Sequence, residues 1–81
     1  MKATSVRLFV KPFCGWCHEA KDWFDERGIK YEELDVVGNG AARKEMHELT
    51  GQTKAPCLEV DGEILADFDT AQLEKFWQKF E

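Results

Sequence analysis

The feature that most constrains this chain is a pair of cysteines two residues apart, Cys14 and Cys17. Residues 6–10 are β-branched and aromatic and predict a strand, which Pro12 ends because proline cannot donate to a strand ladder. Residues 15–27 repeat apolar side chains at helical spacing. The unpaired N–H groups and the dipole at a helix start favour a thiolate, and a second thiol one turn along can attack a mixed disulfide. The spacing and its setting therefore predict a thiol redox site.

The rest of the chain predicts three more strands and two more helices. Residues 31–37 indicate a strand parallel to the first, because the intervening helix makes a right-handed crossover. The dipeptide Asp61-Gly62 lies between two short apolar runs and predicts a hairpin. Asp69 and Gln72 predict an N-terminal cap for the last helix. The predicted class is α/β, in the order β-α-β-α-β-β-α, with a four-stranded mixed sheet flanked by helices.

Apolar spacing predicts which helix faces are buried. The second helix, ended by Gly51, has one apolar stripe and charged outer faces, including Glu45, that we expect to be a solvated surface. The last helix repeats apolar residues at positions i, i+3, i+4 and i+7. The expected buried residues of these two helices are Ala42, Met46, Leu49, Leu73, Phe76, Trp77 and Phe80.

Composition limits the classes of function. A chain of 81 residues is the size of one small domain, which we expect to span residues 1–81. A net charge of -5 argues against nucleic acid as a partner, and the apolar runs are too short to span a membrane. We expect no signal peptide, because no long apolar run follows the N-terminus. An odd number of cysteines, three, fits a cytoplasmic protein without structural disulfides, and we expect a monomer.

Three segments resemble motifs of a known family. Residues 11–17 resemble its Lys-x-x-Cys-Pro-Tyr-Cys segment, residues 51–56 its Thr-Val-Pro segment, and residues 65–70 its Gly-Gly-x-Asp-Asp segment. In this order and spacing, nearly the whole chain resembles the glutaredoxin branch of the thioredoxin-like superfamily. The chain departs from the family at Gly15 in place of proline, Trp16 in place of tyrosine, Lys54 in place of a small polar residue, and Ala66-Asp67 in place of Gly-Gly.

The resemblance implies a glutathione-dependent thiol–disulfide oxidoreductase. It implies that Cys14 is the nucleophile and Cys17 the resolving thiol. Its partners would be glutathione, acting as the reductant, and disulfide-bearing proteins, with no tightly bound cofactor and no metal. The residues expected to contact glutathione are Lys11 and Lys54 at a carboxylate, Trp16 as an aromatic wall, the Ala55 backbone, Pro56 in a cis peptide bond, and Asp69 with Thr70 at the γ-glutamyl end.

Several alternatives stay open at this point. This chain resembles some family members that have glycine after the first cysteine and hold a [2Fe–2S] cluster between two subunits, in which Cys14 and glutathione would be the ligands. A second alternative is an electron donor to one protein, such as ribonucleotide reductase. The run from Cys14 to His18 also matches the covalent haem attachment signature, but no large apolar cavity is indicated. We expect Cys57 to be a half-buried strand residue, with a reactive third thiol as the alternative.

Overall fold

The computed structural model describes residues 3–81 and confirms the predicted order of elements. Within this range no helix has the length and apolar character needed to cross a membrane. The elements, in chain order, are β1 (Val6–Val10), α1 (Gly15–Glu26), β2 (Glu32–Asp35), α2 (Gly40–Thr50), β3 (Cys57–Val60), β4 (Glu63–Ala66), α3 (Thr70–Trp77) and a final 3-10 turn, η1 (Gln78–Phe80).

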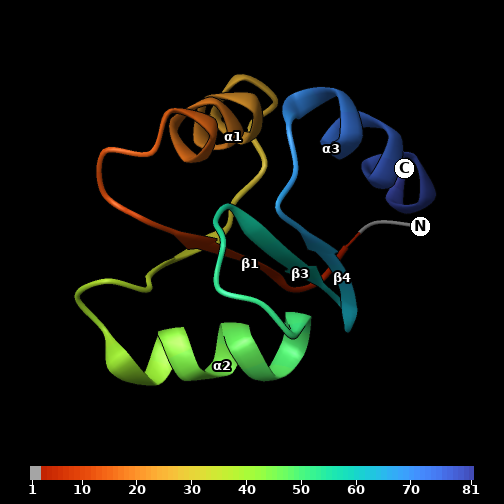
Figure 1. Ribbon diagram of the computed structural model, residues 1–81. Coiled ribbons are helices and arrows are strands. Elements are labelled where there is room, and N and C mark those ends of the chain that lie inside the picture. The colour runs from red at the N-terminus through yellow and green to blue at the C-terminus, as the bar shows by residue number, and fades with distance from the viewer. Residues whose placement is uncertain (1–2) are drawn as a thin grey trace.

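The strands form one mixed sheet of four strands, as predicted, and their order across the sheet is β2-β1-β3-β4. Strand β1 is parallel to β2 and antiparallel to β3, and β4 pairs with β3 as the antiparallel edge. Helices α1 and α3 cover one face of the sheet and α2 covers the other (Figure 1). Strand β2 is shorter than predicted because the Asp35 carboxylate accepts hydrogen bonds from the N–H groups of Val37 and Gly38 and turns the chain.

Successive side chains of β1 point to opposite faces of the sheet, so each face has its own hydrophobic core. Leu8 and Val10 contribute to the core shared with α1 and α3, whereas Phe9 contributes to the core shared with α2. Trp23 and Trp77 pack in the first core with their ring centroids 6.0 Å apart, as expected for packing residues. The first core consists of Leu8, Val10, Cys17, Ala20, Trp23, Phe24, Leu58, Val60, Phe68, Leu73, Trp77 and Phe80, and the second of Phe9, Val36, Ala42, Met46 and Cys57.

Local signals fix the ends of the elements. Asp69 caps α3 and forms the predicted capping box with Gln72. Gly51 ends α2 with φ 73°, a left-handed conformation that glycine adopts without a steric penalty. Asp61 and Gly62 both have positive φ, 50° and 89°, as a tight type I′ hairpin turn requires. These three predictions are confirmed.

Two expectations for α2 are wrong. Leu49 is 36% exposed instead of buried, because it lies at the margin of the apolar stripe, beyond the reach of the sheet. Glu45 is not a merely solvated residue: its carboxylate accepts hydrogen bonds from the Arg7 guanidinium at 2.5 and 2.8 Å. Arg7 also donates to Glu59 on β3 at 2.6 Å. These contacts join α2 to two strands, and the hydrogen bond from Arg7 lowers the pKa of Glu45.

Replacing Glu45→Gln tests this connection. The folded-state pKa of Glu45 lies below its ordinary value, so its contribution to stability is present above the unfolded pKa and is lost as pH falls. We expect Glu45→Gln to lower the free energy of unfolding at pH 7 by about 0.2–1 kcal/mol, since the pair is partly exposed. The difference from the parent should shrink between about pH 5 and pH 3 in urea titrations.

The matched control is Glu48→Gln, which removes a charge from the exposed side of the same helix, where no ion pair forms within residues 3–81. The control should show a smaller loss at pH 7. Equal losses for the two variants would show that helix charge, rather than the Arg7 contact, determines the effect.

Candidate active site

Strand register brings separate parts of the chain to one edge of the sheet. Phe9 near the end of β1 pairs with Cys57 at the start of β3, and Cys57 pairs with Ala66 at the end of β4. The loops that follow β1, precede β3 and follow β4 therefore meet at this edge. The Asp67 N–H donates to the Pro56 carbonyl at 2.9 Å and joins two of these loops directly. The expected site segments thus lie together.

Cys14 is the N-terminal cap of α1. Its sulfur accepts a hydrogen bond from the Cys17 N–H at 3.2 Å, and its carbonyl accepts one from the His18 N–H at 3.0 Å. A serine, threonine or aspartate oxygen normally fills this capping position. Here a half-buried sulfur fills it, and a thiolate is a stronger acceptor than a thiol. The cap therefore places the Cys14 sulfur at the helix start, beside the leading N–H groups of α1.

Cys17 has a different environment from Cys14. Its side chain is 1% exposed and belongs to the core beneath α1. Burial raises the pKa of the Cys17 thiol to about 12, and a hydrogen bond with Cys14 contributes to the rise. No disulfide joins Cys14, Cys17 or Cys57 in this structure. At neutral pH this arrangement holds a proton on Cys17.

Lys11 lies between two surface grooves that we name by their distinctive residues. The Cys14 groove has a volume of about 440 Å³ and the Arg43 groove about 240 Å³. The sequence analysis did not identify Arg43 as a residue of the site. The one available signal was its position in the first turn of α2, because α2 begins soon after β2 ends at the same edge of the sheet as β1. The lining residues are Lys11, Pro12, Phe13, Cys14, Gly15, Cys17, His18 and Lys21 for the Cys14 groove, and Lys11, Val36, Val37, Arg43, Met46 and Thr53 for the Arg43 groove.

The loop before β3 presents Ala55 and Pro56 at the site. The Ala55–Pro56 peptide bond is cis, which confirms the prediction. Pro56 is buried, and half-buried Ala55 packs against the same core as Cys14. Lys54 is exposed, and it is not among the residues that line either groove. The structure therefore packs Ala55 against the core that Cys14 also contacts, and it gives Lys54 no comparable place.

The Cys57 sulfur holds this loop in place. Its thiol donates to the Lys54 carbonyl at 3.0 Å and accepts a hydrogen bond from the Gln52 side-chain amide at 3.3 Å. The Gln52 side-chain oxygen in turn accepts a hydrogen bond from the Lys54 N–H. The expectation of a half-buried residue was wrong: Cys57 is 0% exposed because β3 is an inner strand covered on both faces. Burial raises the pKa of its thiol, which favours a structural over a reactive role.

At the start of α3, the Asp69 N–H is not free to bind a glutathione carboxylate, as the sequence analysis had expected it to be. The Asp69 N–H donates to the Gln72 side-chain oxygen at 3.0 Å, so the capping box already uses it. Thr70, half-buried at the first position of α3, lies beside it. Asp67 has φ 51°, a left-handed conformation that aspartate tolerates better than most residues. This explains how the chain makes the turn without the Gly-Gly pair.

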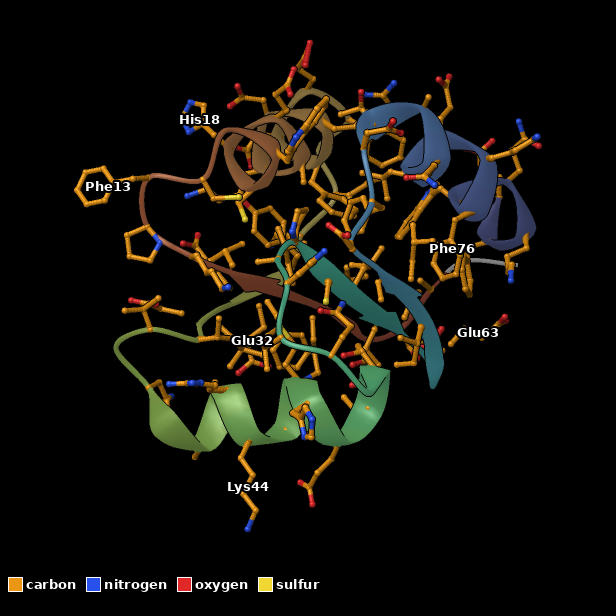
Figure 2. The ribbon with its side chains drawn as sticks, viewed as in Figure 1. Phe13, His18, Glu32, Lys44, Glu63 and Phe76 are labelled. Atoms are coloured by element: carbon orange, nitrogen blue, oxygen red, sulfur yellow. The ribbon has the colours of Figure 1, made fainter. Side chains whose placement is uncertain are left out.

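Exposed aromatic residues flank Cys14 in the sequence. Trp16 is 56% exposed, as expected for a wall beside the site. Phe13, which sequence reasoning did not single out, is 108% exposed, and its ring extends away from the body of the molecule (Figure 2). His18 also faces solvent, as predicted, and its imidazole lies 3.8 Å from Asp22.

The side chains that could bind a metal ion are scattered over the described part of the chain. Across residues 3–81, no group of three or more His, Cys, Asp or Glu side chains is arranged to hold a metal ion. A Cβ added at Gly15 would meet no atom within 4 Å, so packing does not require glycine there. A single chain therefore offers Cys14 as its one partly exposed thiol and no complete ligand set among its described residues.

Sequence comparisons place the chain among known proteins. The profile of the Glutaredoxin family matches residues 6–65. Glutaredoxin 3 of Escherichia coli strain K12 is 32% identical over 65 residues, which cover 80% of this chain and 78% of that protein. An uncharacterized glutaredoxin-like 8.6 kDa protein in the rubredoxin operon of Clostridium pasteurianum is 27% identical over 74 residues, covering 91% of this chain and 99% of that one.

Solved structures share the fold. The thioredoxin-like protein BC3987 superposes with a TM-score of 0.81 at 27% identity, covering 88% of this chain and 97% of that chain. The buckwheat glutaredoxin–glutathione complex superposes with a TM-score of 0.73 at 23% identity, covering 93% and 71% respectively. The expected thioredoxin-like fold, β-α-β-α-β-β-α with a four-stranded mixed sheet, is thereby confirmed.

Thiol labelling tests the structural role of Cys57. In the folded protein we expect iodoacetamide to modify Cys14 and to leave Cys57 unmodified until urea unfolds the chain, because Cys57 is fully buried. Cys57→Ala should lower the free energy of unfolding by about 1–3 kcal/mol, since it leaves the Lys54 carbonyl and the Gln52 amide without this partner.

Cys57→Ser is the matched control, because a hydroxyl also donates and accepts, and its loss of stability should be smaller. Peptide mapping by mass spectrometry identifies the labelled thiol. Labelling of Cys57 in the folded protein as fast as that of Cys14 would contradict the structural role.

Proposed function

This chain belongs to the glutaredoxin family, and on that premise we propose that it is a thiol–disulfide oxidoreductase acting through Cys14 and Cys17. The observation that carries the proposal is the contrast between the two sulfurs. The Cys14 sulfur caps α1 and is partly exposed. The Cys17 thiol lies one turn along the helix, is buried and has a raised pKa. The two environments suit a nucleophile and a resolving thiol respectively.

In the first step the Cys14 thiolate attacks one sulfur of the substrate disulfide. A bond forms between that sulfur and Cys14, the substrate S–S bond breaks, and the departing thiolate takes a proton from water. The protein then holds a mixed disulfide at Cys14. Burial of Cys17 keeps its thiol protonated during this step, so it does not compete as a nucleophile.

The mixed disulfide has two routes of resolution. A glutathione thiolate attacks the substrate sulfur or the Cys14 sulfur, or Cys17 loses its proton and attacks Cys14, which releases the substrate thiol and closes a Cys14–Cys17 disulfide. Once Cys14 is part of a disulfide it carries no charge, so the part of the Cys17 pKa rise that comes from Cys14 disappears. Two glutathione molecules then reduce the internal disulfide and leave as glutathione disulfide.

We further propose how glutathione binds. Lys11 and Arg43 take the glycine carboxylate in the Arg43 groove, and the Ala55 backbone pairs with the glutathione cysteine beside Pro56. At the start of α3 the Thr70 N–H meets the γ-glutamyl carboxylate, and the Asp69 side chain meets the ammonium. Trp16 forms an aromatic wall, and Lys54 contributes at longer range. The buckwheat relative is a complex with glutathione, which supports this ligand.

No observation in the described residues favours a [2Fe–2S] carrier over an oxidoreductase. It would require two chains, two glutathiones and room around Cys14, and the open space at Gly15 is equally compatible with alanine. We therefore assign no step to a cluster. Three free cysteines fit a reducing compartment, and we propose a cytoplasmic protein that works as a monomer.

Serine substitutions test the division of labour between the two thiols. Cys14→Ser should abolish reduction of every disulfide, because the helix-capping nucleophile is lost. Cys17→Ser should retain most of its activity on a small glutathione mixed disulfide, since external glutathione resolves the intermediate, and should lose reduction of protein disulfides. The coupled oxidation of NADPH by glutathione reductase measures both rates. Full activity in Cys14→Ser would exclude the assignment.

Charge substitutions test the glutathione contacts. Lys11→Ala and Arg43→Ala should each raise the Michaelis constant for a glutathione mixed disulfide about two- to five-fold, the effect of one exposed charge pair. Raising the salt concentration should reduce the difference from the parent. Lys54→Ala should have a smaller effect, because Lys54 is not among the residues lining either groove.

Lys44→Ala is the control, since it removes the same charge from the residue next to Arg43 on a side chain that points away from the sheet (Figure 2). Its Michaelis constant should equal that of the parent. If the Lys11→Ala and Arg43→Ala values also stay at the parental level, glutathione binds elsewhere.

A further inference from the structure

Phe13 combines two unfavourable features that the fold does not explain. Its backbone has φ 59°, a left-handed conformation in which a bulky side chain is strained. Its side chain is 108% exposed, so the strain is not compensated by packing. Figure 2 shows the ring extending from the loop before α1 into solvent. Residues held in strained backbone conformations cluster at active sites and ligand-binding sites.

Phe13 belongs to the lining of the Cys14 groove, and its ring extends from there into solvent. Phe13 and Cys14 both line the Cys14 groove, so an apolar group bound against Phe13 sits next to the nucleophilic sulfur. An exposed aromatic ring supplies a large apolar contact area at a small entropic cost, because it has only two rotatable bonds. Such residues often contribute most of the binding free energy of a protein interface.

The charges around this groove are all of one kind. Its charged and titratable side chains are Lys11, His18 and Lys21, and no carboxylate is among its described lining residues. Lys21 and His18 each lie near one exposed carboxylate, at 3.4 and 3.8 Å, whereas Lys11 forms no ion pair within residues 3–81. The whole chain has a net charge of -5, so this edge is locally basic on an acidic protein. A partner of complementary charge is acidic.

We propose that Phe13 is the docking residue for protein substrates, and that the preferred substrate is a disulfide in an acidic peptide segment with an apolar side chain next to the reacting cysteine. The apolar side chain packs on Phe13, and the flanking carboxylates approach Lys11 and Lys21. This inference rests on the proposed function, since it names the class of protein disulfide on which the same cysteine pair acts. The bonds made and broken are those of that reaction.

The test uses three synthetic peptides with the same internal disulfide ring. In the first the ring is flanked by leucine and glutamate, in the second by leucine and lysine, and in the third by serine and glutamate. A small glutathione mixed disulfide serves as the reference substrate. The ratio kcat/KM is measured for the parent protein, Phe13→Asn, Phe13→Tyr and Leu49→Asn. Asparagine tolerates a left-handed backbone, so Phe13→Asn removes the ring and keeps the loop.

We expect the parent to prefer the leucine–glutamate peptide over the leucine–lysine peptide at least ten-fold, and the preference to fall in high salt. Phe13→Asn should lower kcat/KM for the leucine–glutamate peptide about five- to ten-fold and leave the serine–glutamate peptide and the reference substrate unchanged. Phe13→Tyr should retain parental values. Leu49→Asn, which removes an exposed apolar side chain from α2, should also match the parent. The melting temperature of Phe13→Asn should not fall below that of the parent.

A binding measurement separates this inference from the proposed function. The leucine–glutamate peptide with serine in place of both cysteines cannot react, and its dissociation constant, followed by NMR titration, should rise about five- to ten-fold in Phe13→Asn. If the parent protein has no activity on the reference substrate, the proposed function is contradicted. Equal kcat/KM and equal affinity for all peptides, or equal losses in Phe13→Asn on every substrate, would overturn the docking role while leaving that function intact.

Discussion

The hydrogen bond from the Cys17 N–H to the Cys14 sulfur, 3.2 Å long, makes the sulfur of the proposed nucleophile part of a helix cap. The first turn of α1 needs an acceptor at this position, because its leading N–H groups have no partner within the helix. Moving the sulfur would therefore weaken the helix that also buries Cys17, Ala20 and Phe24 in the core. The local requirement of the helix and the chemical requirement of the site are met by one contact.

The three cysteines show how environment separates identical side chains. Cys14 is partly exposed at a helix start, Cys17 is buried one turn along, and Cys57 is buried on an inner strand. Burial raises the pKa of the latter two thiols. Only Cys14 combines partial exposure with a position at a helix start, while the Cys57 sulfur holds the loop of Ala55 and Pro56 through Lys54 and Gln52. The proposed nucleophile thus differs from the other two thiols in position rather than in residue type.

Sequence reasoning predicted what depends on local pattern. Periodicity and caps gave the order of elements, the hairpin at Asp61-Gly62 and the capping box at Asp69, each of which needs only neighbours along the chain. The contact between Arg7 and Glu45 was missed, because the two residues lie 38 positions apart and meet only after α2 packs on the sheet. The burial of Cys57 was underestimated, because a strand pattern does not reveal whether the strand is inner or edge.

The candidate site was predicted in part for the same reason. Motifs located Cys14, Ala55 and Pro56, whereas the closeness of Lys11 to Arg43 in one groove depends on the end of β2 reaching the same edge as the end of β1. The conformation of Phe13 had no sequence signal, because phenylalanine rarely adopts positive φ and nothing nearby indicates it.

The central claim, that Cys14 alone is the nucleophile, has a direct test in mass spectrometry. Cys17→Ser is mixed with glutathione disulfide at neutral pH, quenched with acid and mapped by peptide. The account predicts one glutathione joined to Cys14, because the exposed helix-capping sulfur reacts and the serine cannot resolve the adduct. An adduct on buried Cys57 instead, or no adduct at all, would contradict it.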